Sequence, residues 1–185
     1  MTATPLPYDT SLCLLALQYG TDKAPRSGHG YTPYYHELFK DHRESVRKVL
    51  EIGIDVGASL RMWRDYFPNA IIYALDCDNT KLIDEGRIRS LFCNQGDTIQ
   101  LQGAIDWAGQ NFDLILDDGS HEPAHQILSA SMLIPTLSSD GIYLIEDVLH
   151  PEQIVPWISY KSEVVSFDLA RDPYNNVIVI RGDAQ

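Results

Sequence analysis

Cysteines are few in this chain of 185 residues: only Cys13, Cys77 and Cys93 are present, and they stand far apart. An odd number of widely spaced cysteines does not build a disulfide framework and suits free thiols in a reducing compartment. Long apolar runs are also missing, since no segment approaches the ~18 residues that a membrane-spanning helix needs. The N-terminus has no basic stretch followed by an apolar one, as a secretory signal would have. We therefore expect a soluble, cytoplasmic protein.

Basic residues are scarce as well. Lysine and arginine number 14 against 26 aspartate and glutamate residues, which gives a formal net charge of -12. Such a chain repels polyphosphates, so binding to DNA or RNA would lack its usual driving force, the release of counterions. A length of 185 residues with 44% hydrophobic residues suits one compact domain. We expect a small-molecule ligand, and neither nucleic acid nor a membrane as partner.

The first part of the sequence predicts two helices joined by a loop. Apolar residues recur at helical spacing over residues 11–19, and Gly20 is placed to end that helix. Residues 20–31 are rich in glycine, polar and charged residues, which is typical of a loop or lid. A second helix is expected over residues 34–39.

From residue 48 onward, strands alternate with turns and helices. Helices are expected after Gly57 and from Pro123. Strands are expected at residues 49–52, 70–75, 90–93, 112–116 and 142–145, followed by a hairpin of 163–168 and 177–181. This alternation predicts a doubly wound α/β sheet, mostly parallel, with a C-terminal antiparallel hairpin. We assign residues 1–47 to N-terminal helices and a lid segment, and residues 48–185 to the main domain.

Two glycines and a later aspartate predict a turn that binds a nucleoside. Gly53 and Gly57 follow the first strand and precede a helix, so a ligand can approach the backbone there. Asp76 ends the second strand, where α/β nucleotide folds place a carboxylate that accepts hydrogen bonds from ribose hydroxyls. Asp55 breaks the GxGxxG spacing, and its charge is a poor neighbour for a pyrophosphate. An adenosine-type cofactor without phosphate fits better than NAD.

Acidic residues end two further apolar runs, which read FDLILDDGSH over residues 112–121 and IED over residues 145–147. Unpaired buried carboxylates cost roughly several kcal/mol unless a metal or a cation compensates their charge. The carboxyl ends of parallel strands meet at one edge of a sheet, where ligands bind. The sequence therefore indicates a site that holds a divalent ion, formed by Asp117, Asp118, His121, Glu146 and Asp147.

The loop EIGxxxG, the terminal Asp76 and the pair Gly96-Asp97 resemble motifs of the class I S-adenosylmethionine-dependent methyltransferases, which have a Rossmann-like fold. The resemblance implies ribose binding by Asp76, adenine recognition near Asp97, and contacts of the methionine end with residues 53–57 and Asp117. The predicted cofactor-binding residues are Thr21, Lys23, Glu51, Gly53, Gly57, Asp76, Asp97 and Asp117.

A narrower resemblance comes from the GTDK motif at residues 20–23 with Tyr31, from DDGSH at residues 117–121, and from the later Glu-Asp pair. These motifs resemble the metal-dependent sugar O-methyltransferases of macrolide biosynthesis, of the mycinamicin type, and the related cephalosporin hydroxylases. The resemblance implies methyl transfer to a hydroxyl of a sugar or natural-product scaffold. A hard dication acidifies and orients such a hydroxyl. The predicted Mg²⁺ ligands are Asp118, Glu146 and Asp147, and the predicted catalytic residues are Asp118 and His121, the latter as base.

Other interpretations stay open at this point. Asp118 and Ser120 could cap the helix that begins at Pro123, and His121 could be a surface residue of its first turn. Glu146 and Asp147 could form a solvated strand end. The cephalosporin hydroxylase resemblance leaves a hydroxylase open. A noncatalytic cofactor-binding partner subunit is a further alternative. A homo-oligomer is compatible with either.

Overall fold

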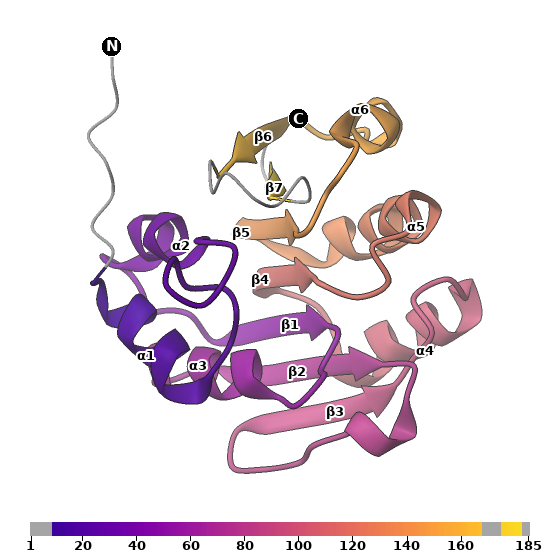
Figure 1. The fold of residues 1–185 in the computed structure, drawn as a ribbon. Helices are drawn as coiled ribbons and strands as arrows, with labels where there is room; N and C mark the ends of the chain where they lie inside the picture. The colour runs from indigo at the N-terminus through magenta and orange to yellow at the C-terminus, as the bar shows by residue number, and fades with distance from the viewer. Residues whose placement is uncertain (1–8, 168–174, 183–185) are drawn as a thin grey trace.

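The strands of the computed structural model form one sheet with the order β3-β2-β1-β4-β5-β7-β6 (Figure 1). The structure describes residues 9–167 and 175–182, and the seven strands lie within these ranges. Their bounds are Lys48–Ile52 (β1), Ile71–Asp76 (β2), Ile88–Phe92 (β3), Phe112–Asp117 (β4), Leu137–Ile145 (β5), Ser162–Ser166 (β6) and Asn176–Arg181 (β7). Strands β1 to β5 pair in parallel, and β7 pairs antiparallel with both β5 and β6. The predicted Rossmann-like sheet with a C-terminal antiparallel hairpin is confirmed; position 168, expected at the end of β6, lies outside the described residues.

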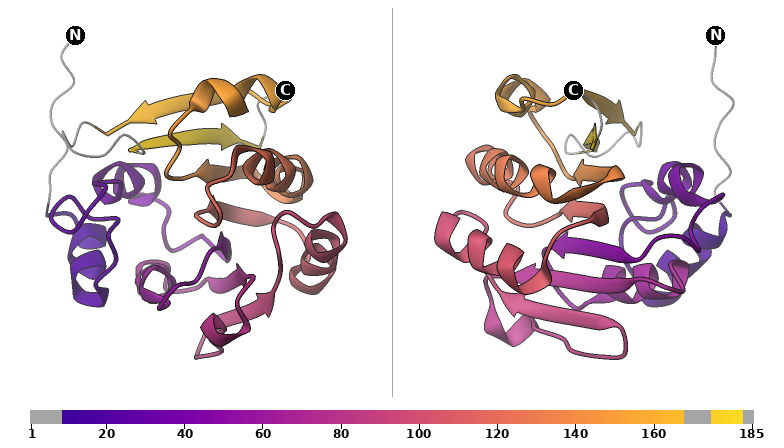
Figure 2. Two further views of the ribbon diagram at one scale, coloured as in Figure 1. Left: turned by 45° about the vertical axis from the view of Figure 1, so that its right-hand side comes forward. Right: turned by 180° about the vertical axis from the view of Figure 1, so that it is seen from behind.

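Helices cover both faces of the sheet (Figures 1 and 2). The α-helices are Ser11–Tyr19 (α1), Thr32–Phe39 (α2), Ala58–Tyr66 (α3), Thr98–Ala108 (α4), Pro123–Leu133 (α5) and Pro151–Ile154 (α6), and short 3-10 turns lie at Asn79–Lys81, Ile134–Thr136 and Val155–Trp157. Two apolar cores result. Leu12, Tyr35 and Trp63 of α1 to α3 pack on one face of the strands, while Leu101 and Leu133 of α4 and α5 pack on the other. Burial on both faces explains why the parallel strands are nearly continuous apolar runs.

Helix α4 is an element that the sequence interpretation did not assign. Its sequence, TIQLQGAIDWA, carries Gly103 in the middle and mixes apolar with polar residues on both sides. Asp97 starts the helix, because its carboxylate accepts hydrogen bonds from the backbone N–H groups of Ile99 and Gln100. The helix fills the connection between β3 and β4 that a parallel crossover requires.

The sheet reverses its strand order between β1 and β4, and the loops that follow these two strands lie side by side. The backbone N–H of Asp118 donates to the carbonyl of Ile52 at 3.0 Å, and that of Gly53 donates to Leu75 at 2.8 Å. The N–H of Glu146 donates to the carbonyl of Asp117 at 3.0 Å. These hydrogen bonds continue the pairing of the strands beyond their ends. They fix the loops at the place where α/β sheets bind ligands. Among the described residues, no helix is long and apolar enough to cross a membrane.

Candidate functional site

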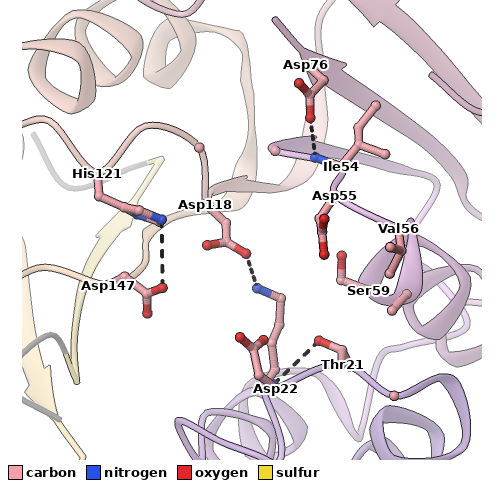
Figure 3. Close-up of a pocket in the computed structure, with 15 residues that line it drawn as sticks. Thr21, Asp22, Ile54, Asp55, Val56, Ser59, Asp76, Asp118, His121 and Asp147 are labelled. Carbon is pink, nitrogen blue, oxygen red and sulfur yellow. Dashed lines mark hydrogen bonds and ion pairs between the residues drawn. The ribbon is translucent and has the colours of Figure 1, made fainter. Parts of the chain in front are cut away.

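A cavity of about 440 Å³ opens at the switch point, the place between β1 and β4 where the strand order reverses (Figure 3). Its walls come from five parts of the chain: residues 20–23, the segment from the end of β1 to the start of α3, Asp76 at the end of β2, and the residues that follow β4 and β5. Residues as far apart in sequence as Gly20 and Asp147, 127 positions, therefore meet in one place. A smaller cavity of about 240 Å³ adjoins it and shares Gly53, Asp76 and Gly119 as lining residues.

Asp118, His121 and Asp147 form a cluster on one side of the cavity (Figure 3). One ligand atom of each lies within 4.8 Å of the others, so the three could hold a metal ion together. The Nε2 of His121 is 4.0 Å from Oδ2 of Asp147. Both of these residues have a left-handed backbone, with φ of 57° and 55°. Non-glycine residues adopt that conformation at a cost, and it recurs at functional sites.

Lys23 reaches this cluster from the loop after α1. Its ammonium donates to Oδ2 of Asp118 at 2.5 Å and also to Glu146, and it lies 3.8 Å from Oε1 of Glu51. Only 2% of the side chain is exposed. Burial alone lowers the pKa of Lys23, but the negative charges of Asp118, Glu146 and Glu51 outweigh it and raise the pKa well above its usual value. Lys23 is therefore a buried cation among carboxylates, an environment that the loop composition did not reveal.

Glu146 and Asp147 point into different surroundings, although they are adjacent in sequence. Glu146 is buried, and its carboxylate accepts hydrogen bonds from Lys23 and, at 2.9 Å, from the hydroxyl of Tyr35. Burial raises the pKa of Glu146. Asp147 is 18% exposed and accepts a hydrogen bond of 2.6 Å from the hydroxyl of Tyr31. Burial and the neighbouring charge of Asp118 raise the pKa of Asp147. Asp147 lines the cavity, and Glu146 lies behind it.

Glu51 completes the buried carboxylates. It is fully buried near the end of β1, and burial raises its pKa to about 7 although Lys23 opposes this shift. Neither carboxylate oxygen makes a hydrogen bond of normal geometry within the described ranges. Glu51 thus contacts the cluster through Lys23 and does not line the cavity.

Asp76 lies across the cavity from the carboxylate cluster (Figure 3). Its Oδ2 accepts a hydrogen bond of 2.9 Å from the N–H of Ile54, and its Oδ1 accepts one of 2.8 Å from Asp78. Asp76 therefore fixes the glycine turn, and because it lines both cavities it stands at their junction. Gly57, the N-cap of α3 with φ of 72°, shapes this turn without lining either cavity.

Two predicted cofactor residues point elsewhere. The carboxylate of Asp117 is buried and accepts hydrogen bonds from Gln95 at 2.9 Å and Tyr143 at 3.2 Å, and burial raises its pKa. The carboxylate of Asp97 accepts hydrogen bonds from the N-terminal backbone N–H groups of α4, and these hydrogen bonds lower its pKa. Neither residue lines the two cavities at the switch point. Of the predicted cofactor residues, those that line the larger cavity are Thr21, Lys23, Gly53 and Asp76.

The geometry does not support two of the alternative interpretations of the acidic motifs, helix capping by Asp118 and a solvated Glu146. The N-cap of α5 is Glu122, and no side chain caps that helix, so Asp118 is free of this role. Ser120 does accept a bond of 3.3 Å from the N–H of Glu122. His121 precedes the helix and lines the cavity. Glu146 is buried and does not form a solvated strand end.

The sequence interpretation missed two residues that support the site. Gln95 donates to Asp117, and its Oε1 accepts the backbone N–H of Ser120 at 2.7 Å, which holds the DDGSH turn. Tyr35 holds Glu146. Gln95 stands directly before the Gly96-Asp97 pair, which was a usable signal, whereas Tyr35 is one aromatic residue of a helix with nothing to distinguish it.

The comparisons with known proteins agree with this architecture. No family model matches the chain. Mycinamicin VI 2''-O-methyltransferase from Micromonospora griseorubida is 39% identical over 127 residues, which are 65% of this chain and 32% of that protein. A tetracenomycin-C rhamnosyl 2'-O-methyltransferase from Streptomyces olivaceus is 35% identical over 141 residues, 72% of this chain and 36% of that protein. The chain spans about a third of the length of these relatives.

Solved structures give the same result. The MycE methyltransferase of the mycinamycin pathway, in complex with Mg, SAH and mycinamycin VI, matches with a TM-score of 0.70 and 35% identity over 78% of this chain and 40% of that one. A second structure of MycE, with Mg and SAH, matches with a TM-score of 0.76 and 28% identity over 94% of this chain and 55% of that one. The chain has the class I S-adenosylmethionine-dependent methyltransferase fold. Over the part that it shares with them, it is a homologue of the macrolide and tetracenomycin sugar O-methyltransferases.

Proposed function

We propose that this chain is the catalytic domain of an S-adenosylmethionine-dependent O-methyltransferase that methylates a hydroxyl of a sugar or natural-product scaffold. One observation carries the proposal: a single cavity has a ribose-type carboxylate, Asp76, on one side and the cluster of Asp118, His121 and Asp147 on the other. A cofactor bound near Asp76 would point its reactive end toward that cluster. The similarity to sugar O-methyltransferases supports this reaction over a hydroxylase.

The cofactor would contact the chain at several positions. Asp76 accepts from the ribose hydroxyls, and Gly53, whose φ is 97°, lets the methionine end approach the backbone. Thr21 and Lys23 close the cavity from the loop. Glu51, Gly57 and Asp117 support the turn and the strand ends from behind, and Asp97 holds the start of α4, near which the adenine would bind.

The donor set fits Mg²⁺. Asp118 and Asp147 belong both to the set predicted from the sequence and to the geometric cluster, and carboxylate oxygens are the ligands that Mg²⁺ prefers. Glu146 is the third carboxylate of the predicted set, and His121 is the third member of the geometric cluster. When bound, the ion would lower the pKa of a coordinated substrate hydroxyl and orient it.

His121 is the base in this proposal. Its imidazole is 37% exposed on the cavity side, where it can accept the proton of a substrate hydroxyl. When bound, S-adenosylmethionine would supply its methyl group to the hydroxyl oxygen as the carbon–sulfur bond breaks and would leave as S-adenosylhomocysteine, and His121 would hold the proton of the hydroxyl. Asp147, 4.0 Å away, stabilises the imidazolium that forms.

Isothermal titration with S-adenosylmethionine and S-adenosylhomocysteine, with and without Mg²⁺, tests the proposal before any acceptor is known. We expect micromolar binding, followed by a mass gain of one CH₂ on a hydroxylated glycoside. A gain of one oxygen would indicate a hydroxylase, and binding without turnover on any acceptor would indicate a noncatalytic partner subunit. Absence of binding in both conditions would contradict the cofactor assignment.

A further inference from the structure

The side chain of Lys23 places a positive charge among the carboxylates of the proposed metal site. Its ammonium contacts residues from the ends of three strands: Glu51 of β1, Asp118 after β4 and Glu146 after β5. Within residues 9–167 and 175–182, no other lysine or arginine forms an ion pair with Asp118 or Glu146. The ammonium thus occupies a position between carboxylates that a metal cation would also seek.

The conflict centres on Asp118. Its Oδ2 accepts the ammonium of Lys23 at 2.5 Å, and the same residue belongs to the cluster that could hold a metal with His121 and Asp147. Mg²⁺ binds carboxylate oxygens at about 2.1 Å, so an ion on Asp118 would lie within a few ångströms of the ammonium. Two cations at that distance repel strongly where water is largely excluded.

We propose that Lys23 competes with the divalent cation: its ammonium neutralises Asp118 and Glu146 in the metal-free protein and leaves Asp118 when Mg²⁺ binds. This inference rests on the proposed function, because that function assigns a metal to the site. Lys23 is then a positioning residue that keeps the carboxylates compensated until the metal arrives.

The ammonium has a place to move to. Lys23 lies in a segment that is neither helix nor strand, its four-carbon stem is flexible, and it lines the cavity of about 440 Å³. In the cavity it would meet the carboxylate of the cofactor, an anion of suitable charge. Metal and cofactor would therefore bind with positive coupling through Lys23.

The loop that carries Lys23 also holds Asp147, through the hydroxyl of Tyr31 at 2.6 Å. A variant of Lys23 could therefore change metal binding by loosening the loop. Tyr31→Phe separates the two effects, because it removes a contact between loop and carboxylate without changing the charge. Lys40→Met is the matched charge control, since Lys40 is an exposed lysine paired with Glu37 on α2, and its loss changes the net charge equally.

The test is the titration of Mg²⁺ into the cofactor-free protein, for wild type, Lys23→Met, Lys40→Met and Tyr31→Phe. We expect Lys23→Met to bind Mg²⁺ about tenfold or more tightly than wild type, Lys40→Met to stay within about twofold, and Tyr31→Phe, which loses a hydrogen bond to the proposed ligand Asp147, to bind no more tightly than wild type. Mg²⁺ should enhance S-adenosylhomocysteine affinity in wild type, and Lys23→Met should lose this enhancement. Tightening no greater than that of Lys40→Met, or weaker binding, would overturn the competition while leaving the metal site intact. If neither wild type nor Lys23→Met binds Mg²⁺, the metal assignment and this inference both fail.

Lys23→Met leaves buried carboxylates without a cation and can fail to fold, so a second measurement uses the wild-type protein. Brief acetylation by N-hydroxysuccinimide acetate, read by mass spectrometry, reports how accessible each lysine is. Lys23 should be protected in EDTA and become several-fold more reactive in saturating Mg²⁺, while the exposed Lys40, which lines neither cavity, serves as the internal reference. Protection of Lys23 that persists in Mg²⁺ would refute the displacement.

Discussion

The backbone of Gly53 packs directly against that of Asp118: a Cβ at position 53 would stand 2.0 Å from the carbonyl oxygen of Asp118. The same glycine has φ of 97°, a conformation that side chains disfavour. The glycine turn after β1 and the acidic turn after β4 can therefore pack together only because position 53 has no side chain. Geometry at the metal cluster depends on geometry at the glycine turn.

Replacement of Gly53 by alanine should consequently damage both turns. We expect a loss of stability of about 2 kcal/mol or more and loss of S-adenosylhomocysteine binding, because the strand ends must separate. Urea unfolding and titration measure the two effects. Gly103→Ala is the control: Gly103 lies inside α4 with open space around it, so alanine should stabilise the protein by roughly 0.5–1 kcal/mol. An equal response of the two variants would contradict this account.

His121 is both the proposed base and a member of the geometric metal cluster, and one variant separates these roles. His121→Ala should lower kcat by about 10²–10⁴-fold while the dissociation constants of cofactor and Mg²⁺ change little. Metal titration and single-turnover rates, measured on the same preparation, distinguish the cases. A large loss of Mg²⁺ affinity would make His121 a ligand instead.

Much of this architecture is readable from the sequence because the signals are local. Apolar runs that end in Asp76 or in Asp117 and Asp118 show where strands stop, and parallel strands bring those ends together. Helix α4 was missed because Gly103 and scattered polar residues blur its periodicity.

The side-chain partners of the site were harder to predict. The environment of Lys23 depends on contacts 95 and 123 positions away, with Asp118 and Glu146. The opposite surroundings of Glu146 and Asp147 depend on a left-handed residue after β5, with φ of 55° at Asp147. No local pattern in the sequence determines either feature.

Asp76→Ala should weaken cofactor binding by about tenfold or more, since it removes the proposed ribose acceptor and also frees the N–H groups of Ile54 and Asp78. Asp76→Asn keeps one acceptor oxygen and should be intermediate. Titration with S-adenosylhomocysteine gives the comparison. An unchanged dissociation constant for the alanine variant would remove Asp76 from the site.

Removal of Mg²⁺ should abolish the proposed methyl transfer. Dialysis against EDTA is expected to abolish turnover. Added Mg²⁺ should restore it, because the bound ion lowers the pKa of the substrate hydroxyl. Asp118→Asn and Asp147→Asn should each weaken Mg²⁺ binding. Glu146→Gln tests the remaining member of the predicted set: full Mg²⁺ affinity in this variant would assign Glu146 to Lys23 and Tyr35 alone. Full activity in EDTA would rule out the metal requirement.

The buried Glu51 should make stability fall as pH rises. Its folded-state pKa of about 7 lies above the usual value of 4.5, so between these pH values the unfolded chain releases a proton that the folded chain retains. Folding therefore disfavours the ionised form of Glu51. This lowers the free energy of unfolding by about 3 kcal/mol once the pH exceeds 7. Glu51→Gln removes this titration, and its stability relative to wild type should rise by up to about that amount between pH 4.5 and 7.5. Urea unfolding at several pH values measures the difference, and a constant difference across this range would show that Glu51 is ionised in the folded protein throughout, held so by Lys23.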